Sequence, residues 1–126
     1  MIPKLRAWDK LDKIISEELS IDFLINVAEL YYRKEDEQYV KPFSDIILEQ
    51  STGLKDKNGK EIFEGDIVGH YHQGYQKGVV KMVDGCWAID DNNESINFEE
   101  LCFEIGAGSG KVIGNIHENA DLLEVE

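Results

Sequence analysis

The sequence predicts a mainly β fold, built as a small SH3-like barrel with a strand-rich N-terminal extension. Short apolar runs recur at intervals of about 8–12 residues, which is typical of barrels and sandwiches. Two dipeptides suited to tight hairpin turns, Asn58-Gly59 and Asp84-Gly85, separate such runs. The turn Gly65-Asp66, the apolar run Ile67-Val68, a long polar loop and a hairpin then follow in the order of an SH3-like barrel.

The N-terminal extension, residues 1–50, begins and ends with predicted strands. Residues 4–9 and 44–50 are short stretches in which apolar and polar side chains mix as on a half-buried strand. Residues 10–32 leave two alternatives open. Their first half matches a helical stripe of apolar residues, which would make the fold α+β, whereas the alternation from Ile21 to Val27 fits a strand.

The barrel core, residues 51–126, follows its turn signals. A type I′ turn at Asn58-Gly59 requires positive φ at both residues. A strand at 62–71, interrupted by Gly65-Asp66, comes next. The later expected elements are a hairpin at 78–83 and 86–90, a short strand from 95, a strand at 111–116 and a helical turn at 119–123. The expected core residues are Ile62, Ile67, Val79, Met82, Trp87, Ile89, Ile113 and Ile116.

Composition indicates one globular domain over residues 1–126. The 126 residues are 42% hydrophobic and 31% charged, which is typical of soluble proteins. No apolar stretch approaches the roughly 20 residues of a membrane span, and the first residues lack the apolar core of a signal peptide. We therefore expect a cytoplasmic protein, in which Cys86 and Cys102 are reduced thiols.

The net charge of −13 is unevenly distributed. Residues 1–81 carry 15 acidic and 12 basic residues, whereas residues 82–126 carry 11 acidic residues and one basic residue, Lys111. Because cationic side chains supply most non-specific affinity for nucleic acids, nucleic acid is an unlikely partner. The acidic half provides solubility, and it could also meet a basic partner or imitate DNA.

The chain contains no catalytic motif. Gly106-Ala107-Gly108-Ser109-Gly110-Lys111 is rich in glycine, but Ile105 and Val112 stand where a P-loop needs Gly and Ser or Thr. His70 and His72 would share one face of a strand and could form a pair of metal ligands, but no third ligand stands at a diagnostic spacing. We expect no enzyme activity, metal or cofactor, with a metal-dependent enzyme using His70 and His72 as one alternative.

We also expect one group of residues to contact a partner and another to form structural turns. Residues 70–78 read as a long loop rich in aromatic and hydrogen-bonding groups, and loops on rigid barrels often bind partners. The possible contact residues are His70, Tyr71, His72 and Tyr75. Asn58, Gly59, Gly65 and Asp66 are instead expected to be structural turn residues.

Three separate segments resemble one family. The run TGLKDKNGKEIFEGDIV at 52–68 resembles the signature of the YopX family of small phage and prophage proteins. Leu5-Arg6-Ala7-Trp8-Asp9 and Val112-Ile113-Gly114-Asn115-Ile116-His117-Glu118-Asn119 resemble its N-terminal and C-terminal pieces, with His117 and Ala120 where Tyr and Pro are usual. The resemblance implies strands in residues 10–32, joined near Ile25-Asn26, and it implies a small barrel. It implies no particular activity.

The function expected from these observations is that of a phage or prophage accessory protein in the cytoplasm of the bacterial host. We expect it to act through protein–protein contacts, with a nucleic-acid-associated small-barrel module as a further alternative. We also expect a homo-oligomer, most simply a dimer that forms through residues 4–32. The basis for this is that the segment Leu5-Arg6-Ala7-Trp8 reads as an unprotected strand edge and Ile21 to Ile25 form an apolar run.

Overall fold

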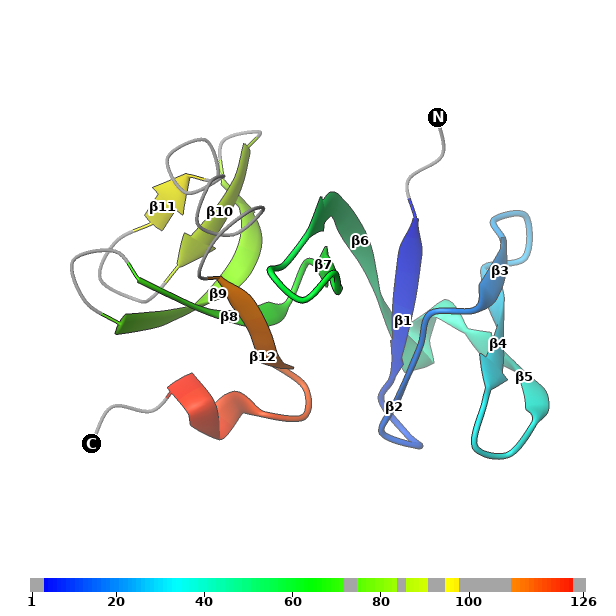
Figure 1. Ribbon diagram of the computed structural model, residues 1–126. Coiled ribbons are helices and arrows are strands. Elements are labelled where there is room, and N and C mark those ends of the chain that lie inside the picture. The colour runs from blue at the N-terminus through cyan, green and yellow to red at the C-terminus, as the bar shows by residue number, and fades with distance from the viewer. Residues whose placement is uncertain (1–3, 72–74, 84–85, 91–94, 98–109, 124–126) are drawn as a thin grey trace. The chain divides into compact units, whose positions relative to one another are not determined.

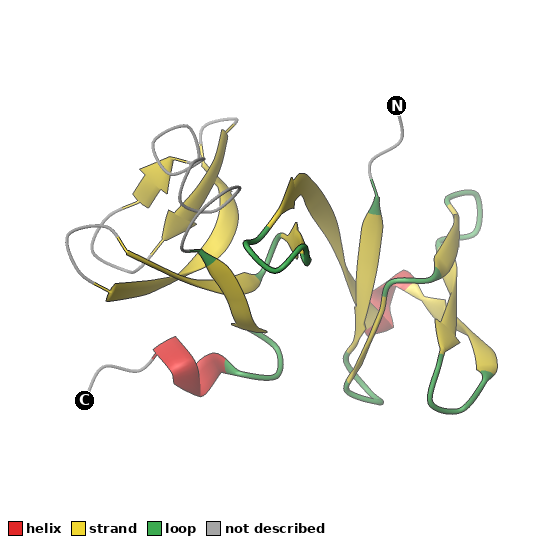
Figure 2. Cartoon of the chain, viewed as in Figure 1, coloured by secondary structure: helices red, strands yellow, loops and turns green. Residues whose placement is uncertain are grey.

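The computed structural model describes residues 4–71, 75–83, 86–90, 95–97 and 110–123. Strands dominate these residues, and two short 3₁₀ helices are the only helical elements among them (Figure 2). The chain forms two compact units, residues 1–50 and 51–126. Each unit has its own hydrophobic core.

In the N-terminal unit, β1 (Leu5–Asp9) lies between β2 (Ile14–Ser16) and the first half of β6 (Ile46–Lys55). A three-stranded antiparallel sheet has the order β3 (Leu19–Asp22), β4 (Val27–Tyr32), β5 (Glu37–Pro42), and η1 (Phe43–Asp45) follows it. The buried core residues of this unit are Ala7, Ala28, Leu30, Tyr32 and Ile46.

The helix considered for residues 10–32 is wrong, because this segment alternates with the period of a strand. Leu19 and Ile21 pack against the core, while Ser20 and Asp22 between them are exposed. The strand does not continue through Ile25 to Val27 as the alternation suggested. It ends at Asp22, and the chain turns at residues 23–26, where Asn26 has a φ of 56°.

In the C-terminal unit, the second half of β6 pairs with β7 (Glu61–Phe63). The larger sheet has the order β11-β10-β9-β8-β12 and curls as in a small barrel (Figure 1), which confirms the predicted mainly β fold. Its strands are β8 (Asp66–Tyr71), β9 (Tyr75–Val83), β10 (Cys86–Asp90), β11 (Ser95–Asn97) and β12 (Lys111–Asn115), and η2 (Ala120–Leu123) follows.

The core of this unit is formed by Ile62, Val68, Val80 and Ile89, with Trp87 and Val112 packed against them. Two residues expected in the core are instead exposed. Met82 is 45% exposed and Ile116 is 37% exposed. Met82 is the last but one residue of β9, and Ile116 directly follows β12. Alternation of apolar and polar residues predicts burial only for those strand positions that other parts of the fold cover.

The turn after β6 is built around one buried carboxylate. Asp56 is 4% exposed, and its Oδ1 accepts hydrogen bonds from the backbone N–H groups of Asn58 and Lys60, both at 2.9 Å. Its Oδ2 accepts one from the N–H of Val112 at 2.8 Å. Of the pair Asn58-Gly59, only Gly59 has positive φ, at 82°. The turn is therefore not type I′. Three residues rather than two connect Asp56 to Lys60, so Asn58 does not need a positive φ.

Two further turns fix the ends of the neighbouring strands. Asp66 Oδ2 accepts a hydrogen bond from the Phe63 N–H at 2.8 Å across the turn that contains Gly65, whose φ is 86°. After β12 the chain turns back so closely that a Cβ on Gly114 would lie 2.6 Å from Asn119 Oδ1. Position 114 therefore accepts only glycine without a rearrangement of the Asn119 side chain.

We predict that Gly59→Val lowers the free energy of unfolding by roughly 1–3 kcal/mol, because a β-branched side chain is strained at this positive φ. There is open space around position 59, so strain rather than collision is the cause. Lys57→Ala, an exposed control in the same turn, should change stability little. Chemical denaturation of both variants tests this, and equal midpoints would contradict it.

A second prediction concerns pH. Burial raises the pKa of Asp56, but the N–H groups of Val112, Lys60 and Asn58 outweigh this and hold it below its ordinary value. The stabilisation is therefore fully present above the unfolded-state pKa of about 3.9 and is lost as pH falls below it. Asp56→Asn places an amide donor opposite the Val112 N–H, and leaving that group unsatisfied costs roughly 1–3 kcal/mol at pH 7.

Denaturation at pH 7, 5, 4 and 3 measures this effect. The wild-type chain should lose more stability between pH 5 and pH 3 than Asp56→Asn does. Asp121→Asn, on the exposed part of η2, makes the same charge change and should follow the wild type. Parallel curves for the wild type and Asp56→Asn would show that the Asp56 carboxylate does not carry the acid sensitivity.

Candidate functional site

The residues proposed as a contact loop lie in a hairpin. His70 and Tyr71 end β8, Tyr75 begins β9, and the backbones of Tyr71 and Tyr75 pair across the two strands. Strand pairing reaches further than expected, so residues 75–78 belong to β9 rather than to a long loop. His72 lies outside the described residues.

The described part of the chain offers no arrangement for metal chemistry. No group of three or more His, Cys, Asp and Glu side chains there could hold a metal ion. Cys102 and the glycine-rich segment 106–109 lie outside the described residues. Nor does any helix in the described ranges have the length and apolar character needed to cross a membrane.

Of the four predicted turn residues, Asn58, Gly59 and Gly65 lie in the two turns that bound β7, and Asp66 is the first residue of β8. The carboxylate of Asp66 accepts the Phe63 N–H inside the fold, and the Asp66 residue is 1% exposed. Asn58 donates its backbone N–H to Asp56. The Asp66 carboxylate and the Asn58 N–H are thus used for hydrogen bonds within the scaffold.

A buried polar cluster in the N-terminal unit is the second place where charged groups gather. Asp9 is fully buried, and its Oδ1 accepts the N–H groups of Leu11 and Asp12 at 2.9 and 3.0 Å. Its Oδ2 accepts the Tyr32 hydroxyl and lies 3.3 Å from Lys41 Nζ. Lys41 Nζ also lies 3.0 Å from Asp12 Oδ2.

The electrostatics of this cluster are those of a structural network. Burial raises the pKa of Asp9, but hydrogen bonds from Tyr32, Asp12, Leu11 and Lys41 outweigh burial and lower it below its ordinary value. Burial and the hydrogen bond to Asp9 raise the pKa of Tyr32 far above its ordinary value. The carboxylate therefore stays charged and the phenol neutral near pH 7.

The N-terminal unit presents a different surface on the opposite side of its three-stranded sheet. Along β4, Ala28, Leu30 and Tyr32 are buried, so the residues between them face away from the core. We call this side the hairpin face. It consists of Ser20 and Asp22 from β3, Val27, Glu29 and Tyr31 from β4, Gln38, Val40 and Pro42 from β5, and the connecting tip Phe23-Leu24-Ile25.

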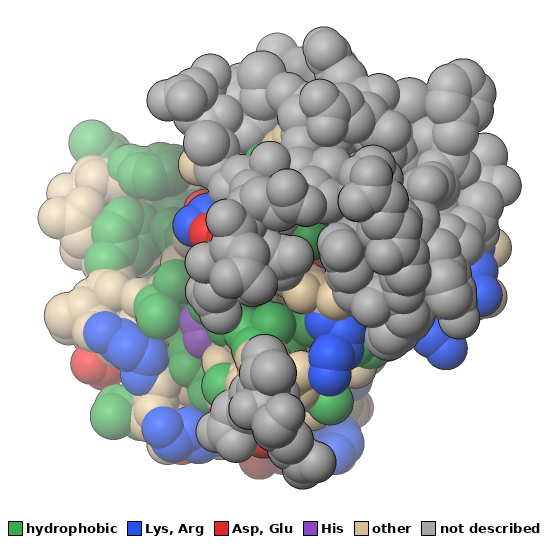
Figure 3. Space-filling model, turned by 90° about the vertical axis from the view of Figure 1, so that its left-hand side faces the viewer, with side chains coloured by type: hydrophobic (Ala, Val, Ile, Leu, Met, Phe, Trp, Pro, Cys, Tyr) green, Lys and Arg blue, Asp and Glu red, His purple; other side chains and the backbone are tan. Residues whose placement is uncertain are grey.

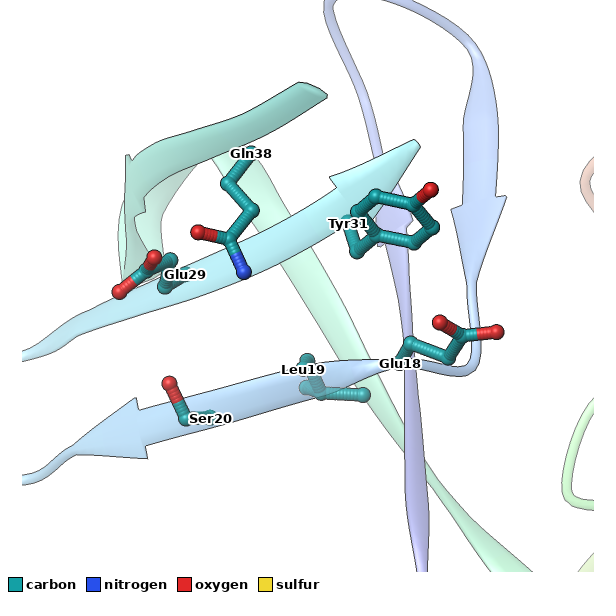
Figure 4. A pocket seen from close by; sticks show the side chains of 6 residues that line it. All are labelled: Glu18, Leu19, Ser20, Glu29, Tyr31 and Gln38. Carbon is teal, nitrogen blue, oxygen red and sulfur yellow. The ribbon is translucent and has the colours of Figure 1, made fainter. Parts of the chain in front are cut away.

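Part of the hairpin face is an open hollow of about 530 Å³. Figure 4 shows Glu29 and Tyr31 along β4, with Ser20 from β3 and Gln38 from β5 on either side. Glu18 and Leu19 complete the lining. The hollow thus contains two carboxylates, an amide, a serine hydroxyl and a tyrosine side chain, which are hydrogen-bonding and cation-binding groups. Glu18 is already paired with Arg33, and the Tyr31 hydroxyl donates to Asp36.

The tip of the hairpin face is apolar and held in place. Phe23, Leu24 and Ile25 are 70%, 94% and 67% exposed. Asp22 Oδ1 accepts the Leu24 N–H at 2.9 Å, and the Phe23 ring packs edge-on against Phe43 with centroids 5.8 Å apart. Three consecutive large apolar side chains are therefore displayed to solvent on an ordered turn.

The tip of the hairpin face could be predicted from the sequence. The run from Ile21 to Ile25 is conspicuously apolar for a small domain, and this signal points to the tip. Nothing in the sequence pointed to the hollow, because Glu29, Tyr31 and Gln38 come together only through the pairing of β4 with β5.

Figure 3 views one face of the molecule, on which the Lys and Arg side chains of the described residues can be located. In Figure 3 the Lys and Arg side chains of the described residues lie in separate groups on the viewed face rather than in one stripe. A backbone-tracking site would need such a stripe, because phosphates repeat along the strand.

Comparison with known proteins identifies the fold and the family. The family model described as YopX protein matches residues 4–124. The crystal structure of protein EF1440 from Enterococcus faecalis is 29% identical, with a TM-score of 0.65, covering 98% of this chain and 99% of that chain. The crystal structure of protein yopX from Bacillus subtilis is 20% identical, with a TM-score of 0.59, and covers 95% of this chain and 97% of that chain. No curated protein matches.

The match to the family model includes all three segments whose resemblance the sequence analysis described, and it spans almost the whole chain. The chain therefore belongs to the YopX protein family.

Proposed function

We propose that this chain is a non-enzymatic accessory protein of a phage or prophage, acting in the bacterial cytoplasm through protein–protein contact, and that the hairpin face is its contact surface. The observation that carries this proposal is the tip Phe23-Leu24-Ile25, where three neighbouring apolar side chains are at least 67% exposed. Val40, on the same face, is 65% exposed.

The cost of exposing these side chains supports a binding role. Burial of one large apolar side chain stabilises a fold or complex by about 1.5–3 kcal/mol, and the tip forgoes much of this in the isolated chain. Contiguous exposed apolar groups beside polar ones typically mark a surface that meets another protein. The tip is also ordered by Asp22 and Phe43, so a partner would not have to fix its conformation on binding.

We predict that Leu24→Asp removes the bound partner from a pull-down out of host lysate. Interface residues at the centre of a contact commonly cost more than 1 kcal/mol when altered, so recovery of the partner should fall by roughly five-fold or more. Leu11→Asp is the matched control, since Leu11 is 66% exposed in the same unit but lies outside the hairpin face.

Quantitative mass spectrometry of the three eluates decides between the outcomes. A protein recovered with the wild type and the Leu11 variant but lost with the Leu24 variant supports the proposal. Equal recovery with all three baits means that the hairpin face is not the contact surface.

Self-association is the second candidate, because the exposed tip could also meet a second copy. The structure changes which part of residues 4–32 could form such a contact. Ala7 and Trp8 do not form a free strand edge, since β1 pairs with β2 through Ala7–Asp9 on one side and with β6 through Leu5–Asp9 on the other. Of the segment 4–32, the tip Phe23-Leu24-Ile25 is the part whose large apolar side chains are displayed together. The acidic residues Asp22 and Glu29, in the two rows nearest the tip, would repel their counterparts in a symmetric contact.

Size exclusion with light scattering tests this candidate. If copies meet through the tip, the wild-type chain at tens of micromolar should have the mass of a dimer, and Leu24→Asp should have that of a monomer. The dimer should also strengthen at high salt, since salt screens the acidic repulsion. A monomer at every salt concentration would eliminate self-association.

A further inference from the structure

The register of the three-stranded sheet orders the hairpin face into rows. Next to the tip, Asp22, Val27 and Pro42 lie across the three strands. The following row is Ser20, Glu29 and Val40, and after it come Tyr31 and Gln38. The face thus changes from apolar at the tip to polar and acidic in the hollow.

The hollow is set for a positive charge. Glu29 is exposed and, within the described residues, forms no ion pair. It stands two residues before Tyr31 on the same face of β4, about 7 Å away at the ordinary rise of a strand. A cation between them would meet a carboxylate and an aromatic ring together, and both groups attract cations.

Two cations of this unit are already paired with its own carboxylates. Arg33, which directly follows β4, pairs with Glu18 of the hollow. Lys41 projects to the opposite side of the sheet, toward Asp9 and Asp12. The carboxylates of Asp22 and Glu29 therefore keep a negative potential over the rows nearest the tip.

The negative charge of the hairpin face favours some binding partners over others. A second copy would bring the same acidic residues to the contact, and a nucleic acid would bring phosphates, so both meet repulsion. A protein segment with Lys or Arg meets attraction at Glu29 and Tyr31, and an apolar side chain of the same segment can cover the tip.

We propose that the hairpin face binds a basic segment of a partner protein, with an apolar residue on the tip Phe23-Leu24-Ile25 and an Arg or Lys in the hollow against Glu29 and Tyr31. The two contacts are three to four strand residues apart, or roughly 10–14 Å. The segment therefore carries its apolar and cationic residues at least three positions apart when extended. This proposal rests on the proposed function, because it names the partner's chemistry for the same surface.

Selection from a displayed library of random 12-residue peptides, with the full chain as bait, tests this directly. Enriched peptides should have an excess of Arg and Lys and should contain a large apolar residue at least three positions from one of them. Synthetic versions of the best peptides should bind about five-fold more weakly to Glu29→Gln and about ten-fold more weakly to Leu24→Ser. Binding should also weaken as salt rises, since the cationic contact is exposed.

Two controls match these variants. Asp121→Asn removes one negative charge in the other unit, and Leu11→Ser removes one exposed leucine outside the hairpin face. Both should bind as the wild type does. Because Glu29 and Leu24 are exposed, their variants should keep the wild-type melting temperature, which checks that the fold is intact.

The outcomes separate the two proposals. Peptides that depend on Leu24 but carry no cation, or that ignore Glu29→Gln, overturn the basic segment and leave the contact surface standing. Peptides that bind all variants equally overturn both. If no peptide is enriched, the basic segment is overturned as occupant. It is likewise overturned if the chain dimerises through the tip and the dimer excludes the enriched peptides.

Discussion

The register of β4 between β3 and β5 is the constraint on which the N-terminal unit and its candidate surface both depend. Because side chains alternate along a strand, one register places Ala28, Leu30 and Tyr32 in the core and leaves Glu29 and Tyr31 outside. A shift by one residue would bury Glu29 and expose Leu30. The same pairing that builds the core therefore builds the hairpin face, and neither can change alone.

Asp9 helps to hold that register from the core side. Its carboxylate accepts the Tyr32 hydroxyl from β4 and lies beside Lys41 of β5. A buried charge is costly unless it is paired and hydrogen-bonded, and this one has partners from the turn after β1 as well. If β4 slipped by one residue, Tyr32 would leave Asp9 and a fully buried charge would lose a donor. The cluster thus adds specificity to a sheet whose apolar contacts alone are modest.

Several residues of the segments that resemble the family act on the backbone. Asp56, Gly59, Gly65 and Asp66 make two turns, and Gly114 admits the Asn119 side chain. None of them belongs to the hairpin face. These positions therefore shape the turns of the chain rather than the hairpin face.

The sequence could predict what depends on local periodicity and turn chemistry. The strands at residues 4–9, 62–71, 86–90 and 111–116 follow from these signals, and so does the Gly65-Asp66 turn. What failed depended on distant neighbours. Asn58-Gly59 looked like a two-residue turn because nothing local shows that the Asp56 carboxylate binds the Lys60 N–H and closes a longer one. Met82 and Ile116 have the right alternation but are 45% and 37% exposed, because alternation alone does not show which strand positions are covered. The hollow could not be predicted because its lining comes from three strands whose register is a tertiary property.

The hydrogen bond from Val112 to Asp56 joins residues 56 positions apart. A chain emerging from the ribosome begins with its N-terminal end, and domains generally fold as units during synthesis. The pairings of β1 with β2 and β6, and of β3 with β4 and β5, lie within residues 5–50 and are available early. The third donor to the Asp56 carboxylate, the Val112 N–H, is synthesised only with β12, the last strand among the described residues. During synthesis the hairpin face can therefore form while the C-terminal unit is still incomplete. The order in which the residues are synthesised thus allows the two units to fold at different times.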